Sequence, residues 1–313
     1  MSKPRSVQAQ AAGLMLASTL SFGVMAICIR LASATEPTWE VAFFRNFFGL
    51  LSLLPILLIP VLRSAKPREA LASIVHTKQL PRYFSRCLIG VISMFCGFWA
   101  IGHLPMSQAI SLAYSSPIFV TIAAVFLLGE KVRMRRWMAV AAGFIGMLVI
   151  VRPGSQAFSP GMLIAVAAAV LSAIVAIQIK QLSKVDGPNT IVLWTYLFWV
   201  PMSLLPALFT WHWPEGIAWL WLVLCGVFGT GGQWLWTRAL KMGEVSALTP
   251  ISFMQLPVVT FAAWWLFDES VDRWTIIGAA IILSATAYIA HREAQLSKRK
   301  ASHAPSEAVE PGN

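Results

Sequence analysis

Charged residues, and acidic residues above all, are scarce in this sequence. Only 12% of its 313 residues are charged, and Asp and Glu together number 13. A soluble domain carries about 25% charged residues, so this chain has roughly half the charge that a water-facing surface needs. Hydrophobic residues make up 58% of the chain, and its mean hydropathy is +0.70. This composition excludes a soluble enzyme, a disordered chain and a disulfide scaffold, and it indicates an all-α polytopic membrane protein.

Motifs for enzyme and metal chemistry are also missing. The chain contains no H-E-x-x-H, G-x-S-x-G or G-x-x-x-x-G-K sequence, which argues against an intramembrane hydrolase and against an ATPase. No CxxC pair or Cys/His cluster occurs, so the cysteines are interpreted as buried thiols. We therefore expect no enzyme, no cofactor and no metal site. The four cysteines all lie in or beside apolar runs: Cys28, Cys87, Cys96 and Cys225.

Apolar runs bounded by charge, proline or glycine predict ten transmembrane helices. A short N-terminus (1–8) precedes them, and a basic, disordered tail (292–313) follows them. Residues 63–82 are expected to form a loop. The predicted helices are 9–31, 39–62, 83–103, 106–128, 134–151, 161–180, 190–210, 217–238, 245–267 and 273–291.

The distribution of Lys and Arg predicts the orientation. If the N-terminus is cytoplasmic, 20 of the 24 basic residues fall on the cytoplasmic side, Arg82 and Arg86 among them. Arg152 and Arg273 fall on the other side, and Arg30 and Arg45 lie within helices. The positive-inside rule then places both termini in the cytoplasm. Because the basic residues follow the loops, the net charge of +11 indicates membrane topology rather than nucleic-acid binding.

The first apolar run has an alternative interpretation as a cleaved secretory signal, because Ala32-Ser33-Ala34 resembles an A-x-A cleavage site. The run is longer than a typical signal core. We expect it to stay in the protein as the first helix.

The two halves of the chain repeat each other. Ser107–Val132 and Ser246–Val271 each begin with Ser, place a proline mid-span (Pro117 and Pro257) and end in acidic residues, and an Arg-Trp pair follows each. The repeats span 9–151 and 161–291. Each contains five predicted helices, and an odd number means that the second repeat enters the membrane from the opposite side. The sequence therefore predicts an inverted pair.

At these residues the chain resembles a known family. The segment FFRNFFGLL (Phe43–Leu51) and the spacing of Ala109, Pro117 and Glu130 resemble the EamA domain of the drug/metabolite transporter superfamily, once in each half. The resemblance implies a ten-helix carrier of the inner (plasma) membrane that works by alternating access, with its substrate cavity between the repeats.

Among substrates, the resemblance favours an amino acid or related zwitterion. The alternative is a larger heteroaromatic metabolite of the riboflavin or S-adenosylmethionine class, taken up or exchanged. A channel and an intramembrane enzyme are alternatives from other classes. The expected partners are a small-molecule metabolite and membrane lipid, and the chain's assembly into a homo-oligomer is left open.

Arg45 is the strongest single candidate for substrate binding. It lies about 9 Å inside its membrane edge at 1.5 Å per residue, and an arginine at that depth normally faces a cavity or a partner. Its planar fork suits a carboxylate or phosphate. The alternatives are that it pairs with Glu40, caps backbone carbonyls or snorkels outward. The neighbouring Asn46 is a candidate ligand or a helix–helix hydrogen bond.

Pro117 and Pro257 are predicted to act as paired hinges, because each removes a backbone donor near mid-span. Simple helix packing is the alternative. Three neighbouring polar residues are then expected to line the transport path: Tyr114, Ser115 and Gln255.

Aromatic residues form a third group of candidates. Most of the 14 Trp residues are expected to be interfacial anchors. The cavity candidates are Trp99, Trp194 and Trp236, with Gln233 as a polar partner in the glycine-rich helix 217–238.

A buried acid at the membrane midplane is absent from the sequence pattern, since all 13 acidic residues lie in loops, tails or helix ends. Proton-coupled carriers normally bury such a group. We therefore expect facilitated diffusion or exchange, or coupling through an unconventional group.

Overall fold

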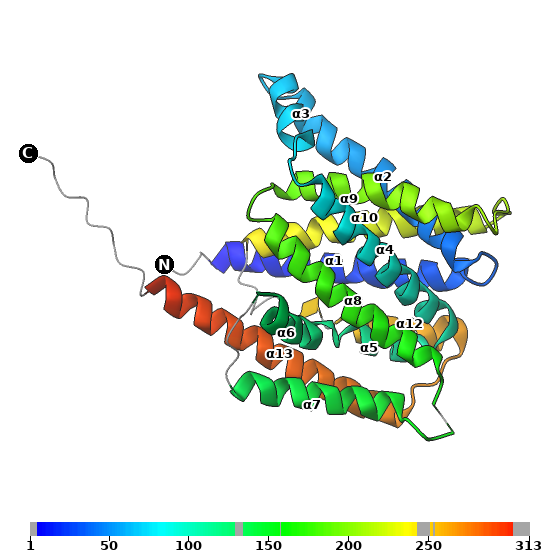
Figure 1. Ribbon diagram of the computed structural model, residues 1–313. Coiled ribbons are helices and arrows are strands. Elements are labelled where there is room, and N and C mark those ends of the chain that lie inside the picture. The colour runs from blue at the N-terminus through cyan, green and yellow to red at the C-terminus, as the bar shows by residue number, and fades with distance from the viewer. Residues whose placement is uncertain (1–4, 129–133, 157, 243–250, 253, 303–313) are drawn as a thin grey trace, which may run out of the picture.

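The computed structural model describes residues 5–128, 134–156, 158–242, 251–252 and 254–302 (Figure 1). Within these ranges the chain forms α-helices joined by turns, and no strand occurs. The helices are α1 (Arg5–Ala32), α2 (Thr38–Leu62), α3 (Pro67–Val75), α4 (Leu80–His103), α5 (Met106–Ala113), α6 (Ser116–Leu128), α7 (Met134–Val151), α8 (Gly161–Leu182), α9 (Pro188–Ala207), α10 (Ala218–Met242), α12 (Gln255–Phe267) and α13 (Arg273–Ser302).

The bundle presents apolar side chains on its outside. Six helices (α1, α2, α4, α8, α9 and α10) are long and apolar enough to cross a bilayer, and α7, α12 and the first part of α13 are shorter apolar helices. Phe126 is 78% exposed and Phe209 is 90% exposed. Apolar surface on this scale indicates that lipid surrounds the bundle, because soluble monomers rarely expose large apolar patches to water. The protein therefore spans the membrane several times.

The two ends of the bundle are distinct (Figure 1). The first turn of α1 and the last turn of α13 lie at one end, called the proximal end below. The α1–α2 and α9–α10 connections lie at the opposite, distal end. Chain direction follows from this. Helix α2 runs from the distal to the proximal end, whereas α4 runs from the proximal to the distal end.

Two segments differ from the sequence prediction. The expected loop 63–82 contains helix α3, which opens with a proline in its first turn, where the missing N–H removes no helical hydrogen bond. Helix α13 runs to Ser302, into the tail that was expected to be disordered, because residues 292–300 are mostly strong helix formers. Residues 303–313 lie outside the described part of the chain.

The span expected at 106–128 is broken into two helices. Helix α5 ends at Ala113 and α6 begins at Ser116, because Pro117 has no N–H to donate to the carbonyl four residues earlier. The Ser115 backbone N–H turns back to the Leu112 carbonyl at 3.0 Å, and its hydroxyl donates to the same carbonyl at 2.6 Å. The expected kink is therefore a complete interruption.

A helix also begins shortly before the second mid-span proline, as α6 does before Pro117. Helix α12 begins at Gln255, two residues before Pro257. Residues 243–250 and 253, which include most of the expected beginning of this span, lie outside the described residues.

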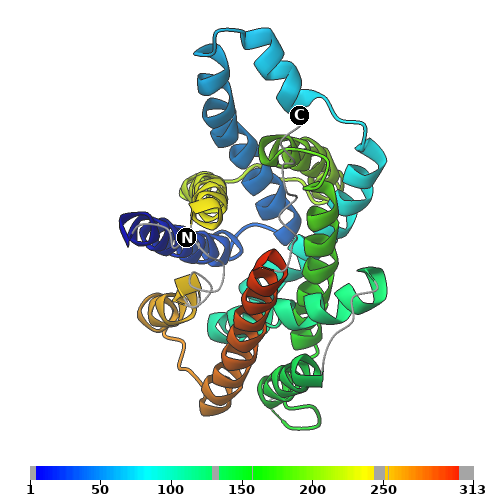
Figure 2. The same ribbon diagram turned by 90° about the vertical axis from the view of Figure 1, so that its left-hand side faces the viewer.

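Helices from the two sequence halves pack in pairs (Figure 2). The most extensive packing joins α1 to α10, α7 to α13, α4 to α8, and α2 to both α10 and α9. At the α7–α13 crossing a Cβ on Gly146 would lie 2.9 Å from the Gly278 carbonyl oxygen, so only glycine permits this approach.

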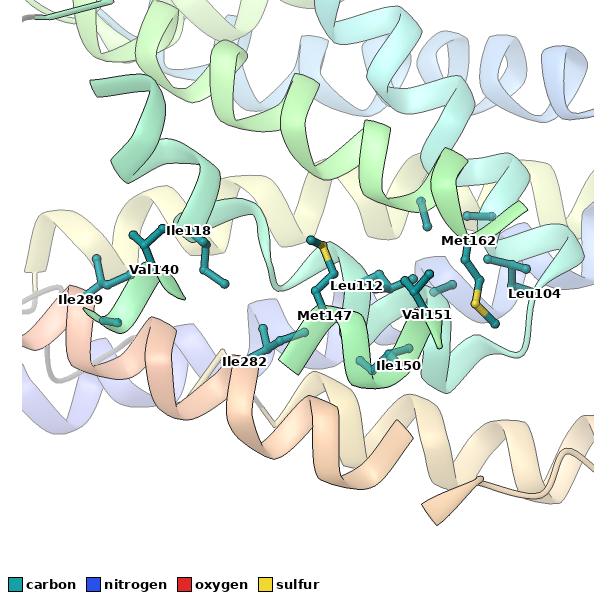
Figure 3. Close-up of a cluster of buried hydrophobic side chains, with 14 residues drawn as sticks. Leu104, Leu112, Ile118, Val140, Met147, Ile150, Val151, Met162, Ile282 and Ile289 are labelled. Atoms are coloured by element: carbon teal, nitrogen blue, oxygen red, sulfur yellow. The ribbon is translucent and has the colours of Figure 1, made fainter. Parts of the chain in front are cut away.

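One buried apolar cluster binds α5, α6, α7, α8 and α13 together (Figure 3). Leu112, Ile150 and Ile282 are fully buried in it. Because Leu112 lies one turn from the interruption in the broken span, the cluster fixes one side of that interruption against α13.

Candidate functional site

Arg45 lies inside the bundle, about two turns after the start of α2, with a side chain only 8% exposed. Its Nη1 donates to the Asn46 Oδ1 at 3.0 Å. Asn46 is fully buried and donates its Nδ2 to the Ser203 Oγ in α9 at 3.1 Å. Asn46 therefore joins α2 to α9 and orients the guanidinium beside it.

Aromatic rings, rather than an acid, surround the Arg45 guanidinium. Its Cζ lies 5.6 Å from the centre of the Tyr196 ring and 5.7 Å from that of Trp199, within the range of cation–π attraction. The Arg45 Nε is buried and has no hydrogen-bond partner. Glu40, the alternative partner, contacts His212 at 3.2 Å instead. Within the described residues Arg45 forms no ion pair.

A second buried arginine approaches the same tryptophan. Arg86 was counted among the basic residues on the cytoplasmic side; the structure shows it within α4 and 5% exposed, so it is a buried helix residue rather than a solvated flanking charge. Its Nη1 donates to the Thr195 hydroxyl, and its Cζ lies 5.6 Å from the Trp199 ring centre. Two guanidinium groups therefore flank one indole, which is possible because Gly90 leaves room for that ring: a Cβ there would lie 3.1 Å from it.

A cavity of about 290 Å³ lies in the proximal half of the bundle, between α2, α9 and α10. Tyr196 and Thr230 form part of its wall, and their hydroxyl groups are 2.8 Å apart. Gln233, a sequence candidate, lines the same cavity. Because the Tyr196 ring also contacts Arg45, this wall separates the cavity from the guanidinium by one aromatic side chain.

Tyr114 and Gln255 are brought together by the structure. Tyr114 lies in the interruption between α5 and α6. Its hydroxyl donates to the Ser252 carbonyl at 2.5 Å and lies 3.2 Å from the Gln255 Oε1. Gln255 is the first residue of α12, two residues before Pro257. The two proline-containing spans therefore meet where each is interrupted. Ser115 is fully buried, and its hydroxyl donates locally to the Leu112 carbonyl at 2.6 Å.

The candidate tryptophans lie apart from Arg45. Trp99 lies near the distal end of α4, stacked on His103 with ring centres 4.4 Å apart. It lines a wide vestibule of about 740 Å³ together with Glu36 and His212. Trp194 donates its Nε1 to the Val75 carbonyl at 3.0 Å and so holds α3 on α9. Trp236 is 39% exposed on α10.

Arg30 ties several helix ends together at the distal end. Its Nη1 donates to the carbonyl groups of Ile101, Gly102 and Leu104 at 2.9, 2.6 and 3.1 Å. Carbonyls at the C-terminus of a helix lack helical partners, so the cation satisfies the end of α4. Its Nη2 bonds to the Glu269 Oε1 at 2.7 Å. The other oxygen of Glu269 accepts the Met106 N–H, the first of α5, at 2.8 Å.

Two further ionic contacts join the sequence halves at the distal end. Arg152, after α7, pairs with Asp272, before α13, at 2.6 Å. His212, in the α9–α10 connection, lies 2.9 Å from a Glu36 oxygen and 3.2 Å from a Glu40 oxygen. Both glutamates are buried, at 5% and 0% exposed. Ionic contacts therefore link residues from the two halves at this end.

The His212 imidazole carries charge readily in this setting. A hydrogen bond to the Thr210 carbonyl raises its pKa, and the nearby Glu40 and Glu36 carboxylates raise it further. The three side chains place potential ligand atoms within 4.8 Å of one another, a geometry that a cation would also satisfy. The ion pairs already account for their proximity.

Sequence reasoning missed Arg86 and the role of Arg30. Arg86 lies six residues after the start of α4, and its position within the predicted helix 83–103 was the available signal. For Arg30 no sequence pattern indicated that its partners would be Glu269 and the end of α4, since these lie far away along the chain.

Comparison with known proteins matches residues 10–152 and 159–290 to the EamA-like transporter family. A riboflavin transporter of Vibrio cholerae is 31% identical over 93% of this chain and 96% of its own length. An S-adenosylmethionine uptake transporter of Rickettsia felis is 29% identical, covering 92% of this chain and 95% of that protein. A pseudopaline exporter of Pseudomonas aeruginosa is 29% identical, covering 87% and 94%.

A solved crystal structure has the same fold. It superposes with a TM-score of 0.59 at 19% identity and covers 93% of this chain and 99% of that chain.

Proposed function

The chain belongs to the EamA-like transporter family, and from this premise we propose that it is an alternating-access carrier of a small organic metabolite in the inner membrane. The proposed topology has ten crossings in two inverted repeats of five helices, with the proximal end in the cytoplasm. Both described chain ends lie at the proximal end (Figure 1), in keeping with the excess of basic residues expected there.

The observation that carries the proposal is the contact between the two interrupted spans. Tyr114, in the interruption between α5 and α6, donates to the Ser252 carbonyl, which lies three residues before α12 begins, at 2.5 Å. A helix interruption concentrates bending at one point, because the backbone hydrogen bonds that stiffen a helix are missing there. Two interruptions joined to each other form a shared pivot, and inverted-repeat carriers place their moving parts at such paired sites.

The packing of the helices supports the inverted repeat. If α1 corresponds to α8 and α4 to α10, exchanging the halves turns the α1–α10 contact into the α8–α4 contact, and both are extensive. If α2 corresponds to α9 and α7 to α13, the same exchange maps the α2–α9 contact and the α7–α13 contact each onto itself. Such exchange symmetry is what two related units of opposite orientation produce.

The ionic contacts bear on the state of the transport cycle that we propose for this structure. At the distal end, Arg30–Glu269, Arg152–Asp272 and His212–Glu36 join residues of the two proposed repeats. The cavity walled by Tyr196 and Gln233 lies in the proximal half. These contacts support a state in which the two repeats are held together at the outer face, where a vestibule of about 740 Å³ also lies, while a smaller cavity lies toward the cytoplasm.

The proposed substrate is a heteroaromatic metabolite of the riboflavin or S-adenosylmethionine class. Support comes from relatives named as transporters of these compounds, whose sequences align with this chain over nearly their whole length. The second candidate is an amino acid or other zwitterion, and the observation in its favour is the buried Arg45 without an acidic partner. For coupling we propose facilitated diffusion or exchange, since the buried acids Glu36 and Glu40 lie at the distal end rather than at mid-span.

Counterflow in reconstituted vesicles tests the proposal. Vesicles preloaded with unlabelled riboflavin or S-adenosylmethionine should accumulate the labelled compound transiently and saturably, which a channel cannot do. Flux that is insensitive to preloading would contradict a carrier, and counterflow seen only with amino acids would transfer the proposal to the second candidate. An imposed pH gradient alone should drive no net accumulation.

A further inference from the structure

Arg45 and Arg86 approach one tryptophan from opposite faces of the membrane. Arg45 lies about 10 Å along α2 from the distal end, and Arg86 lies about 9 Å along α4 from the proximal end, at 1.5 Å per residue. Their Cζ atoms are 5.7 and 5.6 Å from the centre of the Trp199 ring. The three side chains therefore form a row that continues from one half of the bilayer into the other.

The row has positive charge without a matching acid among the described residues. Arg45 bonds to the amide of Asn46, and Arg86 bonds to the hydroxyl of Thr195 and lies 3.6 Å from the Cys87 sulfur. All these partners are neutral groups. Asp186, which lies at the proximal start of α9, accepts instead from Thr77 at 2.7 Å and Tyr83 at 2.9 Å.

Hydrogen-bond donors in the row are unsatisfied. The Nε atoms of Arg45 and Arg86 and the Nε1 of Trp199 are buried, and each lacks a partner. Leaving such donors unpaired is costly in a site that excludes water, and more so for charged donors. Since the two cations are also uncompensated, burying them requires a group that supplies negative charge and acceptor oxygens.

We propose that Arg45, Arg86 and Trp199 form an anion-binding subsite for a carboxylate or phosphate group of the transported metabolite. Such a subsite fits the carboxylate of S-adenosylmethionine or of an amino acid, and it does not fit riboflavin, which has neither group. The assignment rests on the proposed carrier function. Each guanidinium offers a planar fork that matches two oxygens of such a group. The Trp199 ring lies within cation–π distance of both guanidinium groups, and the Nε of each arginine remains available to donate to an anion.

The subsite adjoins the proximal cavity. Tyr196 contacts Arg45 through its ring and forms part of the cavity wall. Tyr196 therefore lies between the cavity and Arg45, and a movement of its ring would bring the two closer to contact. With Arg86 on the proximal side of Trp199, the anion has a cationic partner in either half of the membrane, which suits a group that crosses during transport.

The test uses the full chain in nanodiscs of phosphatidylcholine. Citrate and inorganic phosphate are compared with chloride at equal ionic strength, and the thermal unfolding midpoint is followed by tryptophan fluorescence. A ligand that binds the folded state raises this midpoint with its concentration. We expect a saturable rise with citrate or phosphate, at least tenfold weaker in apparent affinity for Arg45→Gln and for Arg86→Gln.

Arg82→Gln is the matched control, because Arg82 is exposed one turn before Arg86 on the same helix, and it should keep the wild-type response. If the Gln variants fail to fold, Arg45→Lys and Arg86→Lys retain the charge but lose the fork, and they should still weaken the response several-fold. No rise in the wild-type protein, or an equal rise in the arginine variants, would overturn the subsite.

Nanodiscs that contain phosphatidylglycerol separate a solute from a lipid headgroup. If the anionic lipid abolishes the response to citrate, the subsite binds lipid, and the assignment to a metabolite is wrong. A response that persists supports the assignment. Counterflow without an anion response would refute the subsite alone, whereas an anion response without counterflow would refute the carrier function and the subsite's role in it.

Discussion

Removal of the Arg30 guanidinium should weaken the distal closure more than any other single charge change there. Arg30→Gln deletes the ion pair to Glu269 at 2.7 Å and the hydrogen bonds to three carbonyl groups at 2.6–3.1 Å. It also leaves the Glu269 carboxylate, which is 16% exposed, without its cation. The change therefore affects the ends of α1, α4 and the α12–α13 connection together.

The magnitude follows from burial. A hydrogen bond to a charged group contributes about 1.5–3 kcal/mol when buried. The Arg30 side chain is 22% exposed, and a single Nη1 is shared among the three carbonyls, so the contributions do not add fully. We expect Arg30→Gln to lower the free energy of unfolding by about 2–4 kcal/mol.

The assay is unfolding of the purified chain in lipid micelles, followed by circular dichroism. Lys66→Gln is the control, because the Lys66–Glu69 pair is 72% and 70% exposed and such pairs contribute about 0–1 kcal/mol. In the Glu269→Gln background, Arg30→Gln should have a clearly smaller effect, since the ion pair is already absent. The reasoning is refuted if Arg30→Gln and Lys66→Gln change stability equally.

Three further predictions concern the helix contacts, the pivot and pH. Gly226→Ala should destabilise the protein by about 1–3 kcal/mol, because the new Cβ would lie 2.5 Å from a side-chain carbon of α2. Gly231→Ala is the control and should be tolerated, because no atom lies within 4 Å of the added Cβ. Equal unfolding midpoints for the two variants would contradict the α2–α10 packing. Tyr114→Phe removes the hydrogen bond to the Ser252 carbonyl, which should cost about 0.5–1.5 kcal/mol and slow counterflow. An unchanged counterflow rate would contradict the pivot. The folded-state pKa of His212 is raised above its usual value near 6.5. The stability that its ion pairs with Glu36 and Glu40 contribute is therefore complete below pH 6.5 and is lost as the pH rises through the folded-state pKa. This pH-dependent loss of stability should vanish in His212→Gln, and its persistence there would contradict the ion-pair assignment.

The sequence predicted most helix positions because each apolar run ends at charge, proline or glycine. Helix α7 has the predicted limits 134–151, and α2 starts one residue before the predicted position. The interruption at Tyr114 was predicted only as a kink, since periodicity does not show whether the chain restores its hydrogen bonds beyond a proline. Helix α3 was missed because it is short and has no buried residue among those described.

The candidate site was predictable at Arg45 and not at Arg86. Arg45 stands out because it lies six residues inside the predicted helix 39–62, whereas Arg86 lies only three residues inside the predicted helix 83–103 and there resembles a flanking charge. The burial of Arg86 depends on Trp199 and Thr195 of α9, and sequence alone does not bring α4 and α9 together. The same reason explains the tryptophans: Trp99 lies against His103 and Trp194 against Val75, contacts that composition does not specify.

Distance measurements at both ends of the bundle test alternating access most directly. In a variant without the four native cysteines, one spin-label pair at Ala34 and Glu215 reports the distal end, and a second at Arg82 and Lys184 reports the proximal end; all four residues are exposed. Addition of the substrate identified by counterflow should lengthen the distal distance while it shortens the proximal one. Distances that stay constant, or that change in the same direction at both ends, would contradict a carrier that pivots about its two interrupted helices.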